Sequence, residues 1–136
     1  MTSSIKLHRF NFRVYAEDTD MMGIVYHANY LCFFERARTE MLRDYGISLT
    51  MMAGYDTHFA IYDAHLRYLA PARLDDELNI KTSCKHIKAS TLEFKQTIYK
   101  GESSLLCEAT IQVVCLNGKL KPKRLPAEHF QGLFSI

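Results

Sequence analysis

The chain has 136 residues, of which 48% are hydrophobic and 24% are charged, proportions typical of a globular protein with one well-formed core. Its net charge of +2 is too small a basic surplus for a nucleic-acid-binding chain. Basic residues gather over positions 119–124 without interleaved aromatic residues, which indicates a solvated tail, with a docking patch for an acidic partner as the alternative. Neither a run of about 18 apolar residues nor a signal-peptide core is present. We therefore expect residues 1–136 to form a single domain without a transmembrane segment.

The four cysteines are far apart in the sequence and form no Cys-x-x-Cys pair. They are Cys32, Cys84, Cys107 and Cys115. This spacing favours reduced thiols in a cytoplasmic protein over a disulfide framework or a zinc site.

The chain begins with a predicted strand, which is followed by a polar loop and one long helix. Phe10, Phe12 and Val14 alternate with polar residues, which is the period of a half-buried strand. From about His27 to Tyr45 the hydrophobic period becomes helical, and Gly46 is a suitable C-terminal stop.

The hydrophobic face of this helix covers roughly half of its circumference. A face of that width indicates a helix wrapped by a curved sheet. Arg38 falls inside the hydrophobic face, and we expect Glu35, one turn earlier, to pair with it.

Strand patterns dominate the second half, after a less regular stretch over residues 51–56. Alternating hydrophobic residues predict strands over 60–68, 78–84, 92–98 and 107–115, with turns at 100–102 and 117–118. One strand, one long helix and about four antiparallel strands predict an α+β fold whose single helix is buried by the sheet.

The loop before the helix carries the candidate chemistry. It contains Glu17, Asp18 and Asp20, passes through Gly23 and leads to His27. A carboxylate beside a helix start lies near unpaired backbone N–H groups and the positive end of the helix dipole, which favour developing negative charge. Acyl or ester chemistry is therefore indicated, with Glu17 and Asp18 as polar loop residues.

Three stretches resemble the hotdog-fold acyl-CoA thioesterases. They cover residues 13–38, 68–76 and 120–126, and their most informative letters are TD, GIVY and ERAR in the first, YLAPARLDD in the second and LKPKRLP in the third. The chain is most similar to the tol-pal-associated (YbgC-like) branch and less so to the 4-hydroxybenzoyl-CoA thioesterases.

This resemblance implies an antiparallel sheet wrapped around one helix, in a homodimer or homotetramer with active sites at subunit interfaces. It also implies hydrolysis of a coenzyme A thioester with no metal or other cofactor, since coenzyme A is part of the substrate. Acyl carrier protein as the carrier, and work near the cell envelope, are further implications.

The same resemblance assigns roles to residues of the loop and the helix start. It makes Asp20 the catalytic carboxylate, either as general base or as nucleophile. The backbone N–H at or beside His27 would polarise the thioester carbonyl, and the His27 imidazole either assists or is only a polar residue near a helix start. The residues expected to bind substrate or form the pocket wall are Gly23, Val25, Tyr26 and Tyr30.

The sequence contains two further candidate ligand sites. Lys85, Lys88 and Ser90 lie in a predicted turn where relatives hold the nucleotide of coenzyme A, although a solvated surface turn explains them equally well. A metal site formed by Asp18, Asp20 and His27 is disfavoured, because no Cys/His framework accompanies it.

Two other functions remain open from the sequence. A hotdog dehydratase acting on hydroxyacyl thioesters would need a paired histidine and acid, which the Thr19-Asp20 pattern does not present. A non-catalytic module that binds acyl thioesters or acyl carrier protein is the other alternative.

Overall fold

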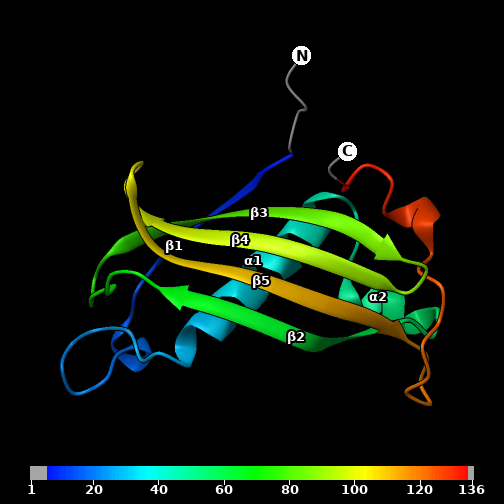
Figure 1. Cartoon of the computed structure of the whole chain (residues 1–136), viewed down its shortest axis with the longest axis horizontal. Helices are drawn as coiled ribbons and strands as arrows, with labels where there is room; N and C mark the ends of the chain where they lie inside the picture. The colour runs from blue at the N-terminus through cyan, green and yellow to red at the C-terminus, as the bar shows by residue number, and fades with distance from the viewer. Residues whose placement is uncertain (1–5, 135–136) are drawn as a thin grey trace.

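Five strands form one antiparallel sheet that lies against a single long helix (Figure 1). This computed structural model describes residues 6–134. The strands are β1 (His8–Arg13), β2 (His58–Tyr68), β3 (Glu77–Lys88), β4 (Thr91–Lys100) and β5 (Ser104–Leu116), and the helices are α1 (Asn29–Asp44) and the short α2 (Leu49–Gly54). The strand order across the sheet is β1-β3-β4-β5-β2, so the predicted α+β architecture is confirmed.

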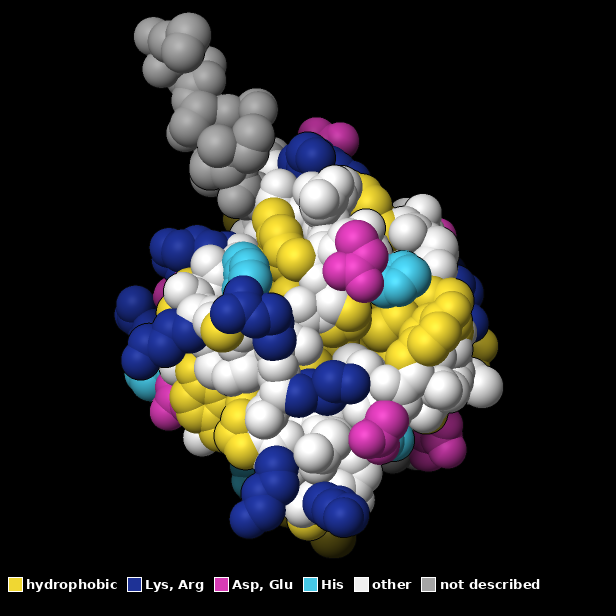
Figure 2. Space-filling model, turned by 90° about the vertical axis from the view of Figure 1, so that its right-hand side faces the viewer, with side chains coloured by type: hydrophobic (Ala, Val, Ile, Leu, Met, Phe, Trp, Pro, Cys, Tyr) yellow, Lys and Arg dark blue, Asp and Glu magenta, His cyan; other side chains and the backbone are white. Residues whose placement is uncertain are grey.

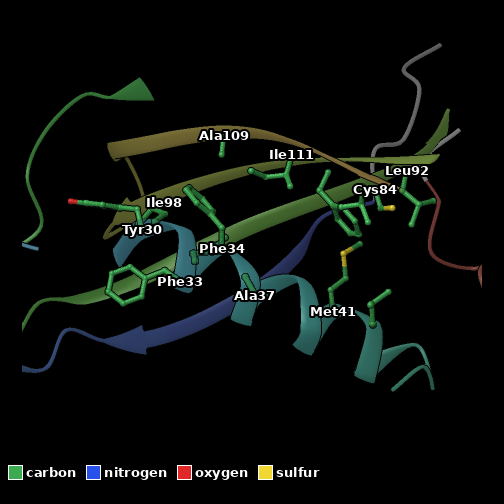
Figure 3. Packing of buried hydrophobic residues seen from close by; sticks show 14 of the residues in the cluster. Tyr30, Phe33, Phe34, Ala37, Met41, Cys84, Leu92, Ile98, Ala109 and Ile111 are labelled. Atoms are coloured by element: carbon green, nitrogen blue, oxygen red, sulfur yellow. The ribbon is translucent and has the colours of Figure 1, made fainter. Parts of the chain in front are cut away.

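The core lies between α1 and the inner face of the sheet (Figure 3). Phe33, Phe34, Ala37 and Met41 project from α1 at helical spacing, and each is at most 1% exposed. They meet alternate residues of β3, β4 and β5, which form the inner side of a pleated surface. Each large side chain buried in this way contributes about 1.5–3 kcal/mol of hydrophobic stabilisation.

The predicted stop of α1 is confirmed. Gly46 has a φ of +79°, and its N–H donates to the Arg43 carbonyl at 2.9 Å. The N–H of Ile47 donates to the Leu42 carbonyl at 2.9 Å. These two bonds form a Schellman motif, which requires a left-handed residue and therefore favours glycine.

The edge strand β2 departs from the predicted alternation. None of its residues is buried, and a register shift between Ile61 and Asp63 interrupts the pattern. β2 lies at the edge of the sheet, where Ile61 and Tyr62 are both exposed. Sequence alternation therefore identified this strand but did not predict its burial.

The short helix α2 falls where the sequence predicted a less regular stretch. It is only six residues long, too short for helical periodicity to be recognised. The local signal is the cap, because the hydroxyl of Ser48 accepts a hydrogen bond from the Met51 N–H at 3.0 Å.

The expected Glu35–Arg38 pair is wrong. Arg38 points toward the sheet and donates from Nη1 to Oε1 of Gln96 at 3.1 Å, whereas Glu35 is exposed and makes no ion pair within residues 6–134. A residue three positions away on a helix lies about 60° away around the axis, so the sheet covers Arg38 and leaves Glu35 outside.

No helix within residues 6–134 has both the length and the apolar composition needed to cross a membrane.

Candidate active site

The acidic loop is held in place by Asp18, which is only 6% exposed. One carboxylate oxygen accepts the Tyr15 N–H at 2.8 Å, and the other accepts Nδ2 of Asn29 at 2.9 Å. The Asp18 carbonyl also accepts the Tyr26 N–H at 2.9 Å. Asp18 is the polar loop residue that the sequence predicts, and it also joins the loop to the first residue of α1. No local sequence signal reveals this role, because Asn29 is eleven residues away.

Asp20, two residues later, has the opposite environment. It is exposed, and its Oδ1 accepts the Met22 N–H at 2.8 Å. The Asp20 N–H donates to the Ile24 carbonyl at 2.9 Å, and the turn is completed by Gly23, whose φ is +77°. Oδ2 of Asp20 has no hydrogen-bond donor among residues 6–134. Asp20 therefore has a fixed backbone and one carboxylate oxygen free for chemistry.

The start of α1 offers unpaired N–H groups. The helix begins at Asn29, two residues after the predicted start, and the Asn29 N–H donates to the Tyr26 carbonyl at 2.8 Å. Within the described residues, the N–H groups of His27, Ala28 and Tyr30 have no hydrogen-bond acceptor. Unpaired donors at a helix start are suited to stabilise an oxyanion.

A cavity of about 290 Å³ opens beside this helix start. Its lining comes from the loop, the beginning of α1 and the segment after β2, namely Ile24, Val25, His27, Tyr30 and residues 68–71. The Tyr68 hydroxyl donates to the His27 carbonyl at 2.8 Å, and the Tyr30 hydroxyl accepts the Ala72 N–H at 3.2 Å. Burial raises the pKa of Tyr30 and that of Tyr68. Both hydroxyls are thus neutral at physiological pH and position the cavity wall.

The structure brings most of the predicted site residues together. His27, Val25 and Tyr30 line the cavity, and Tyr26 lies outside it with its ring 4.5 Å from the His27 ring. Asp20 does not line the cavity. Its backbone N–H is hydrogen-bonded to the carbonyl of Ile24, which does line the cavity.

The predicted nucleotide-binding residues lie elsewhere. Lys85 and Lys88 were predicted in a turn but lie in the last four residues of β3, and only Ser90 is in the turn to β4. The loop lies at the other end of the sheet (Figure 1). Along β3, Lys85 is eight residues and Lys88 eleven residues from Glu77, which is about 26 Å and about 36 Å at roughly 3.3 Å per step. Figure 2 faces the end with this turn and shows Lys and Arg side chains distributed among hydrophobic and uncharged atoms. One chain therefore does not place these residues beside Asp20.

Within residues 6–134, no three His, Cys, Asp or Glu side chains are arranged to hold a metal ion. Asp18, one of the three residues considered for such a site, directs both carboxylate oxygens at N–H donors.

An antiparallel sheet wrapped around one long helix is the hotdog fold. The model of the Thioesterase-like superfamily matches residues 14–133, and the chain belongs to this family. The predicted membership of the hotdog-fold thioesterases is thereby confirmed.

Individual relatives agree with this assignment. The acyl-CoA thioester hydrolase YbgC of Escherichia coli O6:H1 is 46% identical over 121 residues, covering 88% of this chain and 90% of that protein. The acyl-CoA thioesterase YbgC of Haemophilus influenzae is 40% identical, with 88% of each chain covered. The crystal structure of a probable thioesterase from Bartonella henselae superposes with a TM-score of 0.85 at 38% identity, over 89% of this chain and 100% of that one.

Proposed function

We propose that this chain hydrolyses acyl-CoA thioesters, with Asp20 as general base or nucleophile and the N–H groups near His27 as the oxyanion site. The observation that carries the proposal is an exposed carboxylate on a turn that is hydrogen-bonded to Ile24, a lining residue of the cavity at the helix start where the unpaired N–H groups lie. The names of the YbgC relatives support the substrate class.

Two routes use the same groups. In the first, the Asp20 carboxylate takes a proton from water while the water oxygen attacks the thioester carbonyl carbon. In the second, an Asp20 oxygen attacks that carbon, and water hydrolyses the resulting anhydride. The N–H groups at the helix start stabilise the oxyanion in both routes, and the C–S bond then breaks to release coenzyme A. Neither route requires a cofactor.

A symmetric dimer would join the separated parts of the site. β2 is an edge strand that is unpaired on its outer side within residues 6–134, and it exposes Ile61, Tyr62 and Tyr68. Such an edge is a template for another strand. Two β2 strands paired antiparallel around a two-fold axis would bring the β3–β4 turn of the second chain to the same end as the first chain's loop. Lys85, Lys88 and Ser90 would then serve the active site of the second chain.

We also propose that the enzyme works in the cytoplasm as a homodimer or homotetramer. All four cysteines are free thiols, and free thiols persist in a reducing compartment. Acyl carrier protein as an alternative carrier, and a role with the tol-pal system, rest on the YbgC resemblance.

The test is turnover of a panel of short, long and aromatic acyl-CoAs by wild type and Asp20→Asn. Chromatography should follow the loss of substrate, because a thiol dye would react with Cys32, the exposed cysteine. We expect Asp20→Asn to lower kcat by about 10²- to 10⁴-fold, the usual contribution of a positioned base.

Glu17→Gln is the matched control, because it removes an exposed acid from the same loop. Wild-type turnover in Asp20→Asn would refute the assigned mechanism. Substrate binding without hydrolysis by wild type would instead favour the non-catalytic binding module. Such binding would be detected as thermal stabilisation.

A further inference from the structure

A second cavity, of about 270 Å³, lies between the C-terminal half of α1, the start of β2 and the inner face of the sheet. Its walls are mostly apolar and include Leu42 and Phe94. The polar side chains that line it are Glu35, Arg38 and Thr39, all from α1. It shares no lining residue with the cavity at the helix start.

Arg38 is a buried cation without an anionic partner in residues 6–134. Its side chain is 7% exposed, and its Cζ lies 5.9 Å from the centre of the Phe94 ring. No carboxylate in the described chain lies within 4.0 Å of it. Burial lowers the pKa of Arg38 to about 10, so the guanidinium is still charged at neutral pH. Nε and Nη2 make no hydrogen bond within the described residues, yet neither is sealed inside the core.

The contact with Gln96 does not neutralise this charge. Nε2 of Gln96 donates to the Phe34 carbonyl at 3.0 Å and to Oγ1 of Thr82 at 3.1 Å, which fixes its Oε1 toward Arg38. An amide oxygen satisfies one donor but carries no net charge. Glu35 is exposed at the cavity rim, and its charge raises the pKa of Arg38 without forming an ion pair. Because a buried charge is costly unless it is paired, the open side of the guanidinium is suited to an anionic group.

We propose that this cavity holds the far end of the substrate's acyl group and that Arg38 binds a carboxylate there, so that the preferred substrates are coenzyme A monothioesters of dicarboxylic acids. This inference rests on the proposed thioesterase function. The planar guanidinium binds a carboxylate through two parallel hydrogen bonds, and the apolar walls accommodate the methylene chain between the two ends.

The position of the cavity agrees with the proposed dimer. Arg38 is nine residues after Asn29, about 13 Å along α1 from the helix start of its own chain, which is farther than a six-carbon acyl group reaches, so the cavity serves the active site of the second chain. The cavity is next to Phe59 and Ile61, near the beginning of β2. When two β2 strands pair antiparallel, this end of one strand lies opposite the Tyr68 end of the other, where the candidate active site of the second chain begins.

The experiment compares adipoyl-CoA with hexanoyl-CoA, which have the same chain length and differ in a terminal carboxylate. kcat and KM are measured for wild type, Arg38→Met and Arg38→Lys. Arg36→Met is the control, because it removes an exposed arginine from the same helix. We expect Arg38→Met to raise KM for adipoyl-CoA by about tenfold or more, the loss of one charge-assisted contact, with kcat and KM for hexanoyl-CoA within about twofold of wild type. Arg38→Lys keeps the charge but loses the planar fork, so its KM for adipoyl-CoA should be intermediate.

Circular dichroism shows whether Arg38→Met is folded. If the folded variant has the same ratio of kcat/KM for adipoyl-CoA to kcat/KM for hexanoyl-CoA as wild type, the inference is overturned. Hydrolysis of hexanoyl-CoA but not of adipoyl-CoA by wild type would also overturn it. If Arg38→Met fails to fold, an unchanged KM for adipoyl-CoA in Arg38→Lys would do the same.

If wild type hydrolysed none of the acyl-CoAs, the proposed function would be contradicted. Binding of a carboxylate by Arg38 in the cavity would then be tested separately. Millimolar adipate should then raise the Tm of wild type and not that of Arg38→Met. No rise in wild type would overturn the inference.

Discussion

The loop of residues 15–28 and the hairpin end of residues 85–91, where β3 turns into β4, are both polar segments predicted to hold substrate, but the structure builds them differently. In the loop, Asp18 directs both carboxylate oxygens at N–H donors and fixes the start of α1. At the hairpin end, Lys85 and Lys88 are exposed, and their side chains make no hydrogen bond within residues 6–134. Catalysis requires that the reacting and stabilising groups are already in position before the reaction, whereas attraction of a phosphate requires only a positive charge nearby. The first segment therefore meets a structural requirement of a catalytic site, whereas the exposed lysines of the second fit a phosphate-binding surface and a solvated surface equally.

Asp18→Asn tests the construction of the loop and should have the largest effect on stability. The asparagine amide has one oxygen, whereas the Tyr15 N–H and Nδ2 of Asn29 each need an acceptor. One of these two donors would therefore face the NH₂ group of the new side chain. We expect the free energy of unfolding to fall by about 1–3 kcal/mol, the cost of an unsatisfied buried donor. kcat should fall as well, because the helix start loses its link to the loop. Urea unfolding and acyl-CoA turnover provide the two measurements.

Glu17→Gln, already the control for Asp20, also serves here. It changes an exposed acid and should alter stability by less than about 0.5 kcal/mol. If Asp18→Asn unfolds at the same urea concentration as Glu17→Gln, Asp18 does not anchor the loop.

The sequence predicted the fold more completely than the site because the fold depends on periodic patterns. The helix was expected over 27–45 and is found over Asn29–Asp44, and the hydrophobic alternation of β5 matches its burial. The single exception in the strands is β2, whose exposure depends on its place at the sheet edge.

The site depends on contacts between residues that are distant in the sequence. Asp18 bonds Asn29, and Arg38 bonds Gln96 fifty-eight residues away. No spacing rule connects such pairs, and for Arg38 the local rule suggested Glu35 instead. The roles of Asp20 and His27 came from resemblance to a family and are still predictions.

Gly23→Ala sharpens the same comparison with a smaller change. Gly23 has a φ of +77°, and an added Cβ would meet nothing within 4 Å, so the cost is backbone strain alone. We expect a loss of about 1 kcal/mol in the free energy of unfolding and a reduced kcat, because the turn carries Asp20.

Gly54→Ala is the matched control, since it is equally unobstructed but has no positive φ. Alanine there should stabilise the protein by about 0.4–1 kcal/mol. If both substitutions changed the free energy of unfolding by the same amount, alanine at position 23 would cause no backbone strain.

Replacement of Lys85 and Lys88 by alanine should have the smallest effect and tests the second segment. Both side chains are exposed, so we expect unchanged stability and unchanged kcat, with KM for acyl-CoA raised about threefold to tenfold at low salt. Lys119→Ala, another exposed lysine, is the control. A KM that stays at the wild-type value would remove these residues from the site.

Mixed oligomers show which chain these lysines serve. Chains carrying Asp20→Asn are unfolded and refolded together with chains carrying the double lysine substitution. If each chain's lysines serve the other chain's Asp20, half of the sites in a mixed dimer combine an intact Asp20 with intact lysines, and those sites should have the wild-type KM. If the lysines serve their own chain, every active site keeps substituted lysines and KM stays high. The second result would contradict the two-fold arrangement proposed from the exposed edge of β2, because that arrangement brings the turn of one chain to the loop of the other.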